Sequence, residues 1–123
     1  MHKTRILLPV CWLTFCSFCS LYAPHALPAA HAADGNVTIL SPADGAKLGA
    51  ATKNKVTYEA TLGAAGGHVH LYVDDEETAV LRQHKGEYVL DPLAPGNHRV
   101  CIKLVNKAHV PTGMEHCINV TAQ

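Results

Sequence analysis

Hydrophobic and polar residues alternate over several short segments of this chain, which is the pattern of β-strands that bury one face. The clearest segment spans residues 67–74, where Val69 and Leu71 point to one face of the expected strand and His68 and His70 point to the other. Further strands are expected at residues 36–40, 54–62, 79–82, 88–90, 98–105 and 115–121. The pattern predicts about seven short strands and indicates no amphipathic helix.

Turn-forming residues separate these segments. Turns are expected at residues 41–46, 75–78 and 85–87, and a glycine-rich link at residues 63–67. Residues 93–98 read L-A-P-G-N-H, a corner typical of sandwich domains, in which Pro fixes φ and Gly permits a tight turn. We therefore expect an all-β domain, a small antiparallel β-sandwich of the immunoglobulin or fibronectin type.

The first part of the chain has the composition of an export signal. A short basic start is followed by a mostly apolar run over residues 6–23, and Ala30-His31-Ala32 supplies a small-residue cleavage pattern. Cleavage after Ala32 would make residues 1–32 a signal peptide and residues 33–123 one domain, free of the membrane. The expected location is the bacterial periplasm or the medium. The alternative is that the apolar run stays as a membrane anchor.

The charge of the mature domain excludes nucleic acid as its expected partner. The chain has 10 Lys+Arg and 10 Asp+Glu, and Lys3 and Arg5 leave with the signal, so the remaining formal charge is about −2. Such a domain lacks the basic surface that nucleic acids need. The acidic run at residues 74–77 is expected to be a solvated turn.

The two cysteines that remain after the signal is removed are Cys101 and Cys117. An even number of cysteines in an exported domain predicts a disulfide, with two buried or reactive thiols as the alternative. If the last two strands pair antiparallel around a loop near His109, Cys101 lies opposite Cys117 and Ile102 lies opposite His116. This register places the disulfide on the sheet face away from the main core.

Histidines supply the candidate chemistry of the mature domain. His68 and His70 lie two residues apart on one strand face, where two imidazoles can share a copper or zinc ion. The loop region before the last strand adds His109, Met114 and His116, a mixture of borderline and soft donors that suits copper. The candidate metal ligands are therefore His68, His70, His109, Met114 and His116.

Each of these residues also has an ordinary structural explanation. The histidine face of the strand can be solvated, Met114 can cover the end of the core, and His109 can form a hydrogen bond within its loop. His116, which is expected opposite Ile102, can lie at the rim of the core. His98 is expected to form a structural hydrogen bond at its corner.

The sequence gives no support for catalysis. The mature part carries no nucleophile elbow, zinc-protease motif or phosphate-binding loop. Ser41 is its only serine, and its paired carboxylates are confined to residues 74–77. A turn of this kind offers no shielded pocket for acid–base chemistry, so we do not expect an enzyme.

Three motifs occur in order along the mature chain: G-H-V-H-L-Y-V-D, L-A-P-G-N-H-R-V and N-K-A-H-V-P. Together they resemble a group of small exported bacterial immunoglobulin-like domains of unknown function, over roughly residues 36–122. The resemblance implies a sandwich fold and a periplasmic or cell-surface setting, and supplies no activity. Where members of this group often have three consecutive histidines, this chain has Val69 in the middle. The matching positions are His68, His70, Asp74, Pro95, Gly96, His98, His109 and Pro111.

Two looser resemblances concern metals. The H-V-H strand is similar to the copper-binding strand of copper/zinc superoxide dismutase, but this chain is too short for the long zinc loop of that enzyme. Small periplasmic copper carriers are similar in size, export and His/Met content. We therefore expect a non-enzymatic periplasmic binding domain that handles copper or zinc. The alternative is a structural or interaction module whose histidine face contacts a protein of the cell envelope.

Overall fold

A computed structural model describes residues 35–123, which form eight β-strands and no helix. The strands are β1 (Asn36–Ser41), β2 (Lys47–Leu48), β3 (Asn54–Thr61), β4 (His68–Val73), β5 (Glu76–Leu81), β6 (Lys85–Leu90), β7 (Gly96–Val105) and β8 (Pro111–Ala122). Within residues 35–123, then, no helix could cross a membrane. The expected signal peptide, residues 1–32, lies outside the described residues. The all-β prediction is confirmed.

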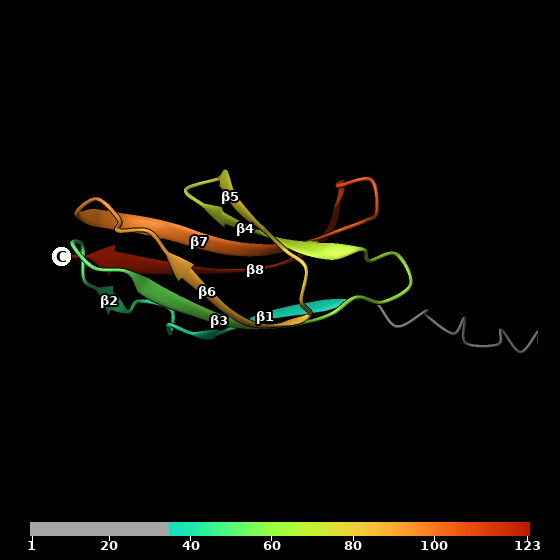
Figure 1. Cartoon of the computed structure of the whole chain (residues 1–123), viewed down its shortest axis with the longest axis horizontal. Helices are drawn as coiled ribbons and strands as arrows, with labels where there is room; N and C mark the ends of the chain where they lie inside the picture. The colour runs from blue at the N-terminus through green and yellow to red at the C-terminus, as the bar shows by residue number, and fades with distance from the viewer. Residues whose placement is uncertain (1–34) are drawn as a thin grey trace, which may run out of the picture.

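The strands form two sheets that pack face to face (Figure 1). One sheet has the order β1-β3-β6 and the other has the order β2-β8-β7-β4-β5. All pairs are antiparallel except β2 with β8. Alternate apolar side chains meet between the sheets, and Leu71, Leu90, Ile102 and Ile118 are among the largest that are fully buried. Burial of each such side chain contributes about 1.5–3 kcal/mol, so the predicted sandwich is held by one shared core.

The register expected for the last two strands is confirmed. Cys101 lies opposite Cys117, and Ile102 lies opposite His116. The two cysteines form a disulfide with a Cα–Cα distance of 4.0 Å. Cys101 also lies opposite Tyr72 of β4, on the face of the sheet away from the core, whereas Ile102 is buried in the core. A crosslink closing a loop of this length stabilises the fold by about 3 kcal/mol in the chain-entropy description.

Two of the expected turns are wrong. Residues 75–78 were expected to turn, but β5 begins at Glu76, because the turn consists of Asp74 and Asp75 alone, with φ values of 52° and 68°. Such a tight hairpin is usually marked by Asn-Gly, and Asp tolerates the same backbone without that signal. Residues 85–87 begin β6 instead of turning. The short strand β2, which was not expected, pairs with the end of β8.

His98 joins the β4–β5 turn to the L-A-P-G-N-H corner. Its Nδ1 lies 2.6 Å from Oδ2 of Asp74, and its Nε2 lies 2.6 Å from the carbonyl oxygen of Ala94. An imidazole donates two hydrogen bonds only when it is protonated, and these contacts, with the Ala94 carbonyl first, raise the pKa of His98. The backbone N–H of Arg99, and after it His98, lowers the pKa of Asp74. His98 therefore links the two turns through both ring nitrogens, and these contacts favour its protonated form.

Candidate metal centre

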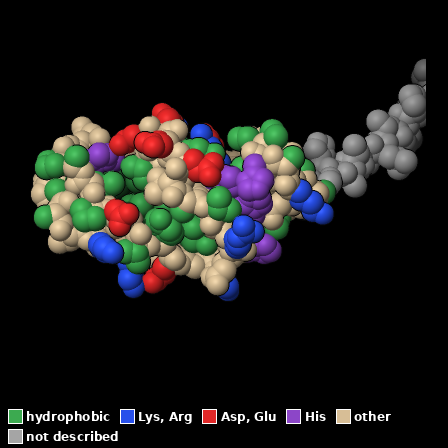
Figure 2. All heavy atoms as spheres, turned by 45° about the horizontal axis from the view of Figure 1, so that its top comes forward, with side chains coloured by type: hydrophobic (Ala, Val, Ile, Leu, Met, Phe, Trp, Pro, Cys, Tyr) green, Lys and Arg blue, Asp and Glu red, His purple; other side chains and the backbone are tan. Residues whose placement is uncertain are grey.

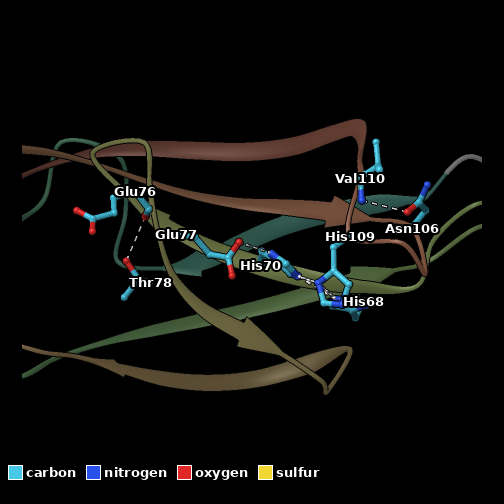
Figure 3. A network of polar contacts seen from close by, with 8 residues as sticks. All are labelled: His68, His70, Glu76, Glu77, Thr78, Asn106, His109 and Val110. Carbon is cyan, nitrogen blue, oxygen red and sulfur yellow. Dashed lines mark hydrogen bonds and ion pairs between the residues drawn. The ribbon is translucent and has the colours of Figure 1, made fainter.

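Three imidazoles meet on the outer face of the five-stranded sheet, at the end where β7 turns into β8 (Figure 3). His68 and His70 point to this face because alternate residues of β4 share a side. His68 lies opposite Val105, the last residue of β7, so β4 begins beside the loop that follows β7. That loop carries His109, which explains how residues distant in sequence come together.

The conformation of the loop is fixed by Asn106. Its Oδ1 accepts hydrogen bonds from the backbone N–H groups of Ala108 at 2.8 Å and Val110 at 3.0 Å. The N–H of His109 donates to the carbonyl of Asn106 at 3.0 Å. These bonds hold His109 at a positive φ of 63°, and its ring turns toward β4. The third imidazole is therefore positioned by its own loop.

One nitrogen from each ring lies at the centre of the cluster. Nε2 of His68 lies 2.9 Å from Nε2 of His70, and Nδ1 of His109 lies 3.3 Å and 3.2 Å from these two atoms. A metal ion bound tetrahedrally through imidazole nitrogens at about 2.0–2.1 Å places those nitrogens about 3.3 Å apart. The triangle of nitrogens is therefore close in size to one face of such a tetrahedron.

Exposure increases across the cluster. His70 is 1% exposed, His68 is half-buried and His109 is exposed. Figure 2 shows the histidine side chains as a patch on the molecular surface, with a Lys or Arg side chain beside it. The centre thus has a buried inner ligand and reaches solvent on its outer side.

The buried ring of His70 has a carboxylate behind it. Nδ1 of His70 lies 3.0 Å from Oε2 of Glu77, on the side of the ring away from the other two imidazoles (Figure 3). A neutral His70 that donates its Nδ1 proton to Glu77 carries a lone pair on Nε2. Carboxylates orient metal-binding histidines in this way and make them more basic.

A β-bulge puts Glu77 on this face of the sheet. Leu71 pairs with Ala79, and the next pair is Tyr72 with Glu77, so Thr78 is an extra residue in β5. Regular pairing would place Thr78 opposite Tyr72 and turn Glu77 to the core-facing side, because neighbouring residues of a strand alternate between faces. Bulges re-aim side chains in this manner.

The surroundings of His68 favour the uncharged form of its ring. Burial lowers the pKa of His68, and the neighbouring His109 and then His70 lower it further. Neutral imidazole is the form that binds metal ions. The surroundings of His68 therefore keep it ready for a cation at neutral pH.

Of the five predicted metal ligands, the structure brings together three: His68, His70 and His109. His116 does not join them. It lies opposite Ile102, and its Nδ1 accepts a 2.8 Å hydrogen bond from the backbone N–H of Ile39 in the other sheet. His116 thus has the core-rim position that the sequence offered as the alternative. Met114 lies in β8 and is 37% exposed, and its part in the site stays a prediction.

The structure corrects one alternative and one expectation drawn from the sequence. The histidine face is not simply solvated, because His70 is buried. Residues 74–77 are more than a solvated turn, because Asp74 binds His98 and Glu77 binds His70. The alternation of residues could not identify Glu77, since its place depends on a bulge that the two-residue period does not contain.

Comparisons with known proteins support the fold. No protein family and no curated protein matches the sequence. Among solved structures, the fibronectin(III)-like modules of CbhA from Clostridium thermocellum match with a TM-score of 0.58 and 18% identity, over 71% of this chain and 96% of the module. An engineered protein matches with a TM-score of 0.51 and 20% identity, over 75% of this chain and 21% of that protein. The described domain therefore has a fibronectin(III)-like β-sandwich fold.

Proposed function

We propose that this protein is an exported, non-enzymatic domain that binds one copper or zinc ion through His68, His70 and His109. The observation that carries the proposal is the triangle of ring nitrogens, with separations of 2.9, 3.2 and 3.3 Å. When the proton of His70 lies on Nδ1 toward Glu77, its Nε2 has only a lone pair to offer the other rings. A cation at the centre satisfies all three nitrogens at once.

The donor set selects the class of metal. Three imidazole nitrogens suit Cu(II) and Zn(II), whereas Cu(I) prefers sulfur ligands. The cysteines of the described domain are joined in the disulfide and supply no thiolate. Cu(II) binds such sites more tightly than Zn(II) in the general order of divalent ions. Copper is thus the first metal to test and zinc the second, with Met114 as the candidate sulfur ligand for Cu(I).

Export and family membership belong to the same proposal. The basic and apolar start of the chain and the pair of cysteines both suit an oxidising compartment outside the cytoplasm. The H-x-H strand, the L-x-P-G-x-H corner and the H-x-P loop support membership in the group of small exported bacterial immunoglobulin-like domains. We therefore propose the periplasm or the medium as the location of this protein.

The test is a metal titration of the processed protein, purified from a bacterial periplasm. Cu(II), Zn(II) and Cu(I) are added in turn, and one tightly bound equivalent of Cu(II) or Zn(II) is expected. The double variant His68→Ala with His70→Ala should lose tight binding. The single variant His109→Asn should weaken it, and Asn tolerates the positive φ of this position, so the loop keeps its conformation.

The matched control is His84→Ala. His84 is an exposed histidine between β5 and β6 and does not belong to the cluster. This variant should bind metal as the parent protein does, and circular dichroism should show the same β-fold in all variants. Weak, non-stoichiometric binding that is equal in every variant would overturn the proposal.

A second candidate function is a structural or interaction module of the cell envelope. It is favoured by the similarity of the fold to the fibronectin(III)-like modules of CbhA. This candidate expects no stoichiometric metal. It expects instead that a periplasmic partner protein is captured, and that the substitutions at His68 and His70 abolish this capture.

A further inference from the structure

We infer that the metal at this centre keeps one coordination position for an external donor, and that a small anion takes this position. The inference rests on the proposed metal binding and goes beyond it, because it assigns a ligand class to the site. It would make the centre an open site that exchanges its outer ligand, in contrast to a closed structural site.

The number of protein ligands leads to this inference. Among residues 35–123, the cluster of ligating histidine, cysteine and acidic side chains has three members. Copper and zinc sites with three protein ligands are completed by water or by an exogenous ligand. Glu77 does not supply the fourth donor, because its Oε2 is held 3.0 Å from Nδ1 of His70, across the ring from Nε2.

The shape of the cluster gives the open position its direction. Nitrogens separated by 2.9 to 3.3 Å form a triangle too small to hold in its plane an ion with bonds of about 2.0–2.1 Å. The ion therefore lies on one side of the triangle. His70 closes the inner side, and His109 lies on the exposed side. The fourth donor can thus reach the ion from solvent.

Charge selects an anion for this position. Three neutral imidazoles leave the full double charge on the ion, and the carboxylate of Glu77 is already hydrogen-bonded to His70. Leu81 pairs with Val69, so Arg82 is the next residue beside His68 and is exposed. The centre and its surroundings are therefore positive, which favours azide, chloride or a small carboxylate over a neutral donor.

The test uses the full processed protein loaded with one equivalent of Co(II), whose visible absorption bands report the number and kind of its ligands. Azide is titrated first and acetate second. The expected result is a change in the visible bands that saturates with one azide per cobalt, with acetate competing for the same position. Bands that stay unchanged at high azide concentration would overturn the inference.

This experiment separates the two levels of the proposal. If none of Cu(II), Zn(II) and Co(II) binds, the proposed function fails. If Co(II) binds with one equivalent and ignores azide, the proposed function stands and the open position fails.

The contribution of charge is tested with Arg82→Gln. The variant should bind azide about two- to five-fold more weakly and cobalt at least as tightly as the parent protein, as expected when a nearby exposed positive charge is removed. The matched control is Lys55→Gln, which removes a cation of the other sheet that is paired with Glu87. Equal loss of azide affinity in both variants, or in neither, would overturn the selection of anions by the site.

Discussion

Histidine side chains lie at both ends of strand β4, three at its start and one beyond its end, and the two sites differ in what the ring nitrogens face. At the start of the strand, the nitrogens of His68, His70 and His109 face one another. Beyond its end, both nitrogens of His98 face oxygen atoms, from Asp74 and from a backbone carbonyl. The first arrangement presents lone pairs to a common point, and the second surrounds the ring with acceptors.

This difference decides the role of each histidine. A ring between two acceptors is most stable as a cation, so the pKa of His98 is raised. Its two hydrogen bonds connect the β4–β5 turn to the corner before β7. A ring among other imidazoles is most stable when neutral, as the lowered pKa of His68 indicates. The partner atoms therefore separate a structural histidine from a candidate metal ligand, although both lie on or beside the same strand.

The largest effect expected from the first cluster, beyond loss of a ligand itself, comes from Glu77→Gln. The substitution removes the negative charge of the carboxylate. That charge orients the His70 ring and makes its Nε2 a stronger donor to a metal ion. Loss of such a partner weakens metal binding by about 10- to 100-fold. Competition with a chromophoric chelator measures the affinity.

Glu76→Gln is the control for this change. Glu76 neighbours Glu77, is exposed, and does not belong to the histidine cluster. Its variant should bind metal with the affinity of the parent protein. Identical affinities in both variants would show that the carboxylate behind His70 does not tune the site.

A smaller effect, on stability alone, is expected from His98→Gln. The amide group of Gln carries its N–H donors on one atom, so it cannot reach both acceptors of the imidazole. The free energy of unfolding should fall by about 2 kcal/mol, because hydrogen bonds of a charged ring are lost. Urea denaturation with a chelator present measures this, and His84→Gln, at an exposed turn, is the control.

The same change should leave metal binding intact. His98 acts at the end of β4 that faces the corner, and the metal cluster lies at the start of the strand. One equivalent of metal with the parent affinity is expected. Strong loss of metal in His98→Gln would mean that the two ends of β4 are coupled, and the division of roles drawn here would be wrong.

Much of the fold could be predicted from the sequence because strands alternate with a period of two. Counting from the loop near His109 places Cys101 opposite Cys117 and Ile102 opposite His116, as the structure shows. The same counting puts His68 and His70 on one face. These predictions depend only on regular pairing, which holds over most of β4, β7 and β8.

The rest of the site depends on local irregularities that the period does not contain. The Asp74-Asp75 turn has two left-handed residues without glycine, and this hid the true start of β5. The extra residue Thr78 then moves Glu77 to the histidine face. The sequence named His109 and His116 as equal candidates, since both are near the last hairpin. Only their contacts in the structure separate them. His109 lies against His70 in the histidine cluster, whereas His116 accepts a hydrogen bond from the backbone of Ile39.

The smallest expected effect is the dependence of stability on pH at the His98 corner. The pKa of His98 is raised, so its cationic form stabilises the fold. This stabilisation is fully present below the ordinary histidine pKa of about 6.5 and is lost as the pH rises through the raised value. The pKa of Asp74 is lowered, so its contribution is present above about 3.9 and is lost as the pH falls through the lowered value.

The difference in unfolding free energy between the parent protein and His98→Gln should therefore be larger at about pH 5.5 than at about pH 8.5. Some difference should persist at the higher pH, because neutral His98 still donates one hydrogen bond to Asp74 or to Ala94. The opposite contribution of His68, whose lowered pKa destabilises the acid form, is common to both proteins and cancels. A difference that stays constant or grows with pH would show that folding does not raise the pKa of His98. The contrast between the two ends of β4 would then rest on geometry alone.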